Sequence, residues 1–187
     1  MKWVLCLAAP WWLVSGCTQW DWTPNYTERD AGYRLVLHKP LTVRPGSARV
    51  FIQHGKMLPG AAFDQYDISC SLEVRHLSEA RQNIEPDTFV VNLVQSLTEE
   101  VASRENLQVA ALHTTWMDLW GDTSSIFRGW HFWLHSKTQP DVLRMSCRGA
   151  FADPWEAYPP TLEEIRYTLG DIGSLQMPFQ NIQPGQY

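Results

Sequence analysis

From about residue 33 onward, apolar and polar side chains alternate along the chain, which predicts a domain built of β-strands. The clearest alternation runs from Ile68 to His76, where Cys70 lies on the apolar side. Such a pattern is typical of a half-buried antiparallel strand. Further strands are expected at 33–38, 49–54, 89–94 and 107–112, and in a hairpin of 127–135 with 142–148.

Three of these segments carry more specific expectations. Residues 89–94 are apolar at almost every position, so we expect this strand to be buried on both faces. Residues 97–105 fit either a helical turn or an irregular excursion. In the return arm of the hairpin, Leu143, Met145 and Cys147 are expected to face inward, whereas the polar side chains face out. These outward residues are Arg144, Ser146 and Arg148.

A single helix is predicted near the C-terminus, at about 161–169. Thr161 and Glu164 have the spacing of a capping box, in which each side chain satisfies a free backbone N–H of the first turn. Leu162, Ile165 and Leu169 share one face, and a glycine follows where a C-terminal cap belongs.

The fold class that follows is mainly β: a single antiparallel β-sandwich or open barrel with one short C-terminal helix. The chain has 187 residues, of which 44% are hydrophobic, enough for one compact domain. We assign residues 32–175 to this β domain and residues 176–187, rich in Gln and Pro, to an extended tail.

The first 16 residues read as a signal peptide. Lys2 provides a positive charge, and an apolar run follows from Trp3 to Val14. This run is too short to cross a bilayer as a helix, which takes about 20 residues.

Val14-Ser15-Gly16-Cys17 resembles the lipobox of bacterial lipoprotein precursors. The resemblance implies that Cys17 receives diacylglycerol, that the chain is cleaved before it, and that the new amino terminus is acylated. The alternative is an ordinary leader that ends near a chance cysteine. Thr18 stands where an Asp would retain such a protein in the inner membrane, which implies an outer-membrane location facing the periplasm.

Residues 17–31 have no sustained period and are expected to form the lipidated tether. Within it, Trp20 and Trp22 fit either the membrane interface or packing onto the domain.

Cys70 and Cys147 remain once the leader is removed and Cys17 is lipidated. An oxidising compartment favours a disulfide between them, and both fall on the core side of their strands. A metal pair would need further ligands at close spacing, and a catalytic thiol is the other alternative. The two cysteine strands and the 161–170 helix also resemble uncharacterised proteobacterial lipoproteins, which implies a location but no activity.

The net charge of the chain and the motifs it lacks limit the kinds of function that the sequence predicts. The 15 basic and 20 acidic residues give a net charge of −5, which argues against a nucleic-acid partner. His131 and His135 lie about 13 Å apart on a strand, too far to share one zinc ion. We find no nucleophile elbow, zinc-protease motif, phosphate loop or dinucleotide fingerprint, so neither a catalytic site nor a cofactor is predicted.

Tryptophan supplies the best candidate for binding. Of the 10 Trp residues, a group lies at Trp116, Trp120, Trp130 and Trp133. Trp130 is expected in the core, whereas Trp133 shares the polar face with His131 and His135. An exposed Trp beside polar groups can anchor a protein or a sugar ring. Alternatively, the 113–126 loop folds over Trp133 and forms a small satellite core.

These observations favour a membrane-anchored envelope lipoprotein that acts as a non-enzymatic binding or assembly module, with an envelope protein as its partner. The alternative is a lipoprotein that binds a small ligand or glycan through Trp116, Trp120 and Trp133.

Overall fold

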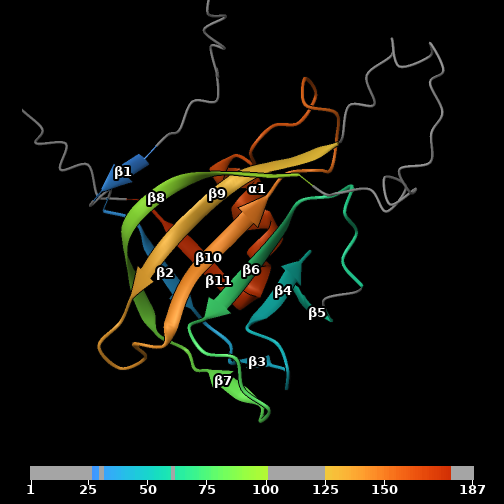
Figure 1. Cartoon of the computed structure of the whole chain (residues 1–187). Coiled ribbons are helices and arrows are strands. Elements are labelled where there is room, and N and C mark those ends of the chain that lie inside the picture. The colour runs from blue at the N-terminus through green and yellow to red at the C-terminus, as the bar shows by residue number, and fades with distance from the viewer. Residues whose placement is uncertain (1–26, 30–31, 60–61, 101–124, 178–187) are drawn as a thin grey trace, which may run out of the picture.

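The computed structural model describes residues 27–29, 32–59, 62–100 and 125–177. The strands are β1 (Thr27–Arg29), β2 (Arg34–Leu37), β3 (Leu41–Val43), β4 (Arg49–Gln53), β5 (Lys56–Leu58), β6 (Ser69–Val74), β7 (Gln82–Ile84), β8 (Thr88–Glu100), β9 (Ile126–His135), β10 (Val142–Arg148) and β11 (Gly173–Gln176). The helix α1 (Leu162–Leu169) precedes β11 (Figure 1).

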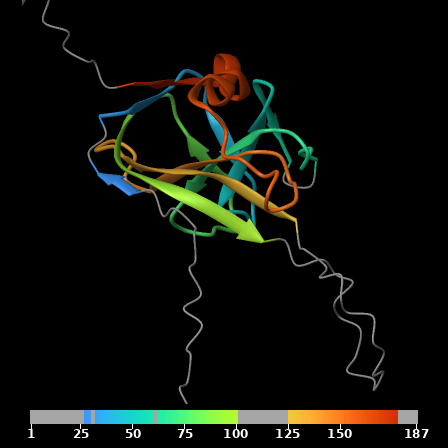
Figure 2. The same cartoon turned by 90° about the horizontal axis from the view of Figure 1, so that it is seen from above.

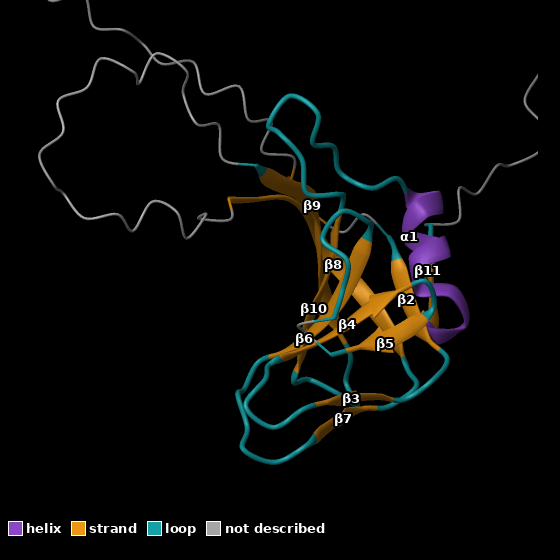
Figure 3. Ribbon diagram, turned by 90° about the vertical axis from the view of Figure 1, so that its right-hand side faces the viewer, coloured by secondary structure: helices purple, strands orange, loops and turns teal. Residues whose placement is uncertain are grey.

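The strands form one large antiparallel sheet in the order β11-β2-β8-β9-β10-β6-β4-β5, with β1 pairing β8 beside β2. The sheet curls into a half-barrel, and α1 lies across its open side (Figures 2 and 3). β3 and β7 pair as a small second sheet at the end of the molecule that is lowest in Figure 1. The mainly β prediction with one late helix is therefore confirmed.

The inner face of the half-barrel holds the core. Cross-strand register puts Val50, Leu72, Met145, Phe132 and Val94 in one row across β4, β6, β10, β9 and β8. All five are buried, and Ile165 and Leu169 of α1 join the same cluster. The helix thus covers an apolar face that the curled sheet leaves open.

The disulfide joins β6 to β10 within this core. Cys70 and Cys147 lie directly opposite each other in the antiparallel register, with their Cα atoms 4.0 Å apart. Their residues are 1% and 0% exposed. The predicted pairing is therefore a cross-strand bond between neighbouring strands.

β8 corrects the expectation for residues 89–94. Phe89 and Val91 are buried, but Val90 between them is 44% exposed. The strand is therefore covered on one face only. A register shift between Val91 and Leu93 then sets Val94 on the core side, so a bulge explains the apolar run that suggested two buried faces. The strand continues through Glu100, so residues 97–100 form neither the helical turn nor the irregular excursion expected for 97–105. Residues 101–105 lie outside the described residues.

A second bulge corrects the assignment of Leu143. The β6–β10 register shifts between Val142 and Arg144, so Val142 enters the core at 4% exposure while Leu143 is only partly buried. Met145 and Cys147 face the core as predicted.

The helix begins and ends as its sequence predicts. The Thr161 hydroxyl accepts a hydrogen bond from the Glu164 backbone, and the Glu164 carboxylate accepts one from the Thr161 backbone. Gly170, with φ +51°, ends the helix and donates to the Arg166 carbonyl.

The β9–β10 turn is held by one carboxylate. Asp87 accepts hydrogen bonds from Ser136 at 2.6 Å, from Thr138 at 2.5 Å and from Gln139 at 3.1 Å. Partial burial raises the pKa of Asp87, but these donors and the Thr88 backbone outweigh it and lower the pKa to about 2.

We expect loss of the disulfide to destabilise the domain. The bond closes a loop between residues 77 apart in sequence, so removing it should lower the unfolding free energy by about 4 kcal/mol on chain entropy. Urea denaturation of Cys70→Ala/Cys147→Ala beside the oxidised wild type measures the difference. Equal midpoints and slopes would contradict it, and the wild type treated with dithiothreitol is the matched control.

Candidate binding surface on the outer face of the sheet

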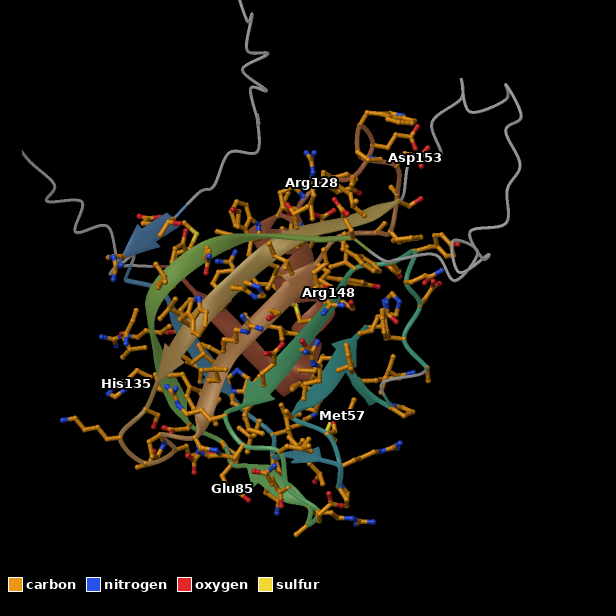
Figure 4. The ribbon with its side chains drawn as sticks, viewed as in Figure 1. Met57, Glu85, Arg128, His135, Arg148 and Asp153 are labelled. Atoms are coloured by element: carbon orange, nitrogen blue, oxygen red, sulfur yellow. A yellow bond between two sulfur atoms is a disulfide. The ribbon has the colours of Figure 1, made fainter. Side chains whose placement is uncertain are left out.

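The face of the sheet opposite the core carries an ordered polar network across β8, β9, β10, β6 and β4 (Figure 4). We call it the outer-face network. Two neighbouring cross-strand rows supply most of it. Its members are Arg49, Glu73, Arg144 and Trp133 in one row, Ser71, Ser146, His131 and Gln95 in the next, and the Arg148–Glu99 pair beyond them.

Glu73 is the buried charge at the centre of the network. Its side chain is 8% exposed, and its carboxylate receives the Arg144 Nε at 2.9 Å and the Arg49 Nη2 at 3.7 Å. A charge withdrawn from water in this way is tolerated only with close partners. Both guanidiniums are therefore held in place on the outer face.

Arg144 extends the network to Trp133. Its guanidinium carbon lies 5.1 Å from the centre of the Trp133 ring, a cation–π geometry. The Trp133 indole N–H donates to the Gln95 side chain at 3.2 Å. Trp133 is thus half-buried and fixed from two sides. Residues 113–124 of the loop that was the alternative cover for Trp133 lie outside the described residues.

His131 and Ser146 form the inner part of the network. The His131 Nδ1 and the Ser146 Oγ are 2.8 Å apart, and the two residues are 9% and 1% exposed. Burial, together with the positive charge of Arg144, lowers the pKa of His131 to about 4, and the Glu73 charge opposes this only in part. The ring is therefore neutral at pH 7.

Arg148 forms a second ion pair on this face. Its Nη2 lies 3.1 Å from a Glu99 carboxylate oxygen, and its guanidinium carbon is 5.6 Å from the centre of the Phe127 ring. Burial lowers the pKa of Arg148, and Glu99 opposes the shift. Arg148 anchors the far end of the surface against β8.

One polar atom in this region has no partner. Ser71 is 2% exposed, and its Oγ makes no hydrogen bond. It lies in its row between Phe51, which is larger, and Ser146, which is itself buried. A buried hydroxyl left unpaired costs about 1–3 kcal/mol.

These side chains correct the expectation that the polar residues of β6 and β10 face solvent. Ser69, Ser71 and Glu73 are 3%, 2% and 6% exposed, and Ser146 and Arg148 are 1% and 8%. They do lie on the face opposite the core. Alternation predicts which face a residue takes, but larger neighbours in the same rows decide how deeply it is buried.

The other predicted residues fall in three places. Cys17, Trp116 and Trp120 lie outside the described residues. Cys70 and Cys147 lie on the inner face, in the same strands that carry the network. Trp130, expected in the core, is only partly buried, and its indole N–H donates to the Pro160 carbonyl at 2.9 Å.

Trp130 also lines a small pocket on the inner side. The pocket encloses about 230 Å³, and its walls include Tyr33, Phe132 and Leu162. It lies between β8, β9 and the beginning of α1, and is mainly apolar.

Sequence reasoning missed Arg144, which stacks on Trp133, and Glu73, which holds Arg144 in place. Arg144 and Glu73 each occupy a polar position of an alternating strand, which is the only signal they give. The β6–β10 register that places Cys70 opposite Cys147 also places Arg144 opposite Glu73. The cysteine pairing could have located them.

Within the described residues, no cluster of three or more His, Cys, Asp or Glu side chains is arranged to hold a metal ion. Nor does that part of the chain contain a helix of the length and apolar character needed to cross a bilayer. Comparisons with protein-family models, curated proteins and solved structures found no match for the chain.

The two facing serines make a matched test of the network. Ser146→Ala leaves the His131 ring without its partner and should destabilise the protein by about 1 kcal/mol or more. Ser71→Ala removes an unpaired hydroxyl and should leave stability unchanged or raise it. Thermal denaturation of both variants beside the wild type measures the two effects. An equal loss of stability in both variants would contradict the assignment of Ser146 as the partner of His131.

The His131 pKa predicts a pH dependence of stability. The unfolded chain binds a proton near pH 6.5, whereas the folded chain resists protonation down to about pH 4. Above pH 6.5, the neutral His131 therefore contributes on the order of 3 kcal/mol to the free energy of unfolding. This contribution is lost as the pH falls toward 4. Denaturation between pH 7 and 4 should show a steeper loss in the wild type than in His131→Gln. His135→Gln, an exposed position on the same strand, is the control and should follow the wild type.

Proposed function

We propose that this chain is an envelope lipoprotein, anchored by lipid on Cys17, whose β domain docks a partner protein on the outer-face network. The domain acts as a non-enzymatic binding or assembly module at the outer membrane, facing the periplasm. The lipobox resemblance of Val14-Ser15-Gly16-Cys17 supports the anchor. The disulfide supports an oxidising compartment.

The Arg144–Trp133 stack is the observation that carries the docking proposal. Trp and Arg are the residue types most enriched among those that dominate protein-binding energy. Here Glu73 fixes Arg144 and Gln95 fixes Trp133 before any partner arrives. Little side-chain freedom is then lost on binding, which favours affinity.

A catalytic reading of the Ser146–His131 pair is less well supported. Ser146 is 1% exposed, so its Oγ is shielded from a substrate carbonyl. Its pKa of about 4 also makes His131 a weak base. The pair is better explained as a structural hydrogen bond beneath the Arg144–Trp133 stack.

Glycan binding through Trp133 is the second candidate, and the cation–π contact weighs against it. Sugar rings stack on an open aromatic face, whereas the Arg144 guanidinium lies over the Trp133 ring. Trp116 and Trp120 stay in this hypothesis as residues outside the described part of the chain.

Photo-crosslinking in living cells tests the docking proposal. A photoreactive amino acid is placed at Val90, which is 44% exposed and borders the network on β8, or at Tyr167, which is 72% exposed on α1. We expect one envelope protein to be captured from Val90 and not from Tyr167. Arg144→Ala, made together with Glu73→Gln so that no buried charge is left without its nearest partner, should abolish that adduct while the protein remains folded and oxidised.

Three results would contradict the proposal. The first is equal capture from both positions, and the second is an adduct that survives Arg144→Ala. The third is the absence of any protein adduct, together with a change in Trp fluorescence on adding envelope glycans that Trp133→Ala removes. The last result would favour the glycan alternative.

A further inference from the structure

A second surface, which shares only Arg49 with the outer-face network, combines positive charge with a free sheet edge. A groove of about 760 Å³ lies between the β4–β5 end of the large sheet and the small β3–β7 sheet. Arg44, Arg49 and Arg81 line it, and none of its described lining residues carries a carboxylate. Met57, which is 49% exposed, adds apolar surface (Figure 4).

Two of these arginines adjoin the paired strands of the small sheet. Val43 with Gln82 is the last pair of the β3–β7 ladder, and Arg44 and Arg81 are the residues next to that pair along the chain. The turn after Arg44 is tied down, because the Gly46 N–H donates to the Ser78 carbonyl at 2.8 Å. Like charges at neighbouring positions of a strand pair repel each other.

Neither guanidinium is neutralised within the described chain. No described carboxylate lies within ion-pair distance of Arg44 or Arg81. Arg49 reaches Glu73 only at 3.7 Å, and Glu73 is already held by Arg144 at 2.9 Å. The groove therefore keeps an excess of positive charge in a protein whose net charge is −5.

We propose that this groove binds an extended acidic peptide segment of a partner protein. β5 is the last strand of the large sheet, and no strand of the described chain pairs with its other edge. Backbone groups at such an edge can pair with an added strand. Carboxylates of the same peptide can then form paired hydrogen bonds with the arginines.

The position of the groove favours a protein over an anionic lipid surface. β1, where the described chain begins, lies on the side of the molecule opposite β5 (Figures 1 and 2). A membrane reached through Cys17 would meet the β1 side first. This choice of partner rests on the proposed anchor, whereas the groove and its charge do not.

Fluorescence anisotropy with a labelled peptide of alternating Glu and Val tests the proposal. The full chain carries Cys17→Ser, so that no lipid is attached, and a Gln–Val peptide is the control probe. We expect the Glu peptide alone to bind, and more weakly as salt is added. Arg44→Glu and Arg81→Glu should each reduce affinity by about tenfold or more. Lys137→Glu, an equal charge change in the exposed β9–β10 turn, should not.

Stability separates a binding role from a structural one. Arg81→Gln removes one of the two neighbouring positive charges, so its Tm should equal or exceed that of the wild type while peptide binding weakens. A lower Tm with unchanged peptide affinity would overturn the proposal. So would equal binding of the two peptides, or binding to phosphatidylglycerol vesicles that depends on Arg44 without peptide binding. The Val90 crosslink is unaffected by these variants, so the two proposals fail independently.

Discussion

The pairing of Cys70 with Cys147 is the constraint on which the rest of the structure depends. In a sheet whose side chains alternate, a slip of β6 by one residue against β10 would exchange the two faces of β6. Leu72 would leave the core, and Glu73 would enter it. The covalent bond between directly opposed residues excludes that slip. It fixes which side of the half-barrel is apolar and which is polar.

The outer-face network follows from the same register. Once Cys70 and Cys147 are opposed, Ser71 faces Ser146 and Glu73 faces Arg144, with His131 and Trp133 next to them on β9. The network is thus rigid because it stands on a packed and covalently closed sheet. The groove at β5 does not depend on the β6–β10 register in this way, because Arg44 and Arg81, which line it, adjoin the strands of the small β3–β7 sheet.

Local patterns in the sequence were enough to predict the β class, the hairpin, the cysteine pairing and the capped helix. The alternation of 68–76 and the Thr161–Glu164 spacing each report on neighbours along the chain. The buried state of Ser71 and Glu73 was not predictable in this way, because it depends on residues from four other strands. The bulges near Asn92 and Leu143 were missed for a related reason: an extra residue in one strand shows only against its partner.

The proposed function requires a chain that is exported, lipid-anchored and oxidised, and the intact mass of the protein taken from membranes tests all three together. The predicted species begins at Cys17, carries diacylglycerol and an amide-linked acyl chain, and is two hydrogens lighter than the reduced form. Fragmentation should place the lipid on Cys17 and the missing hydrogens at Cys70 and Cys147. A chain that begins at Met1, without lipid and with both of these thiols free, would contradict the account.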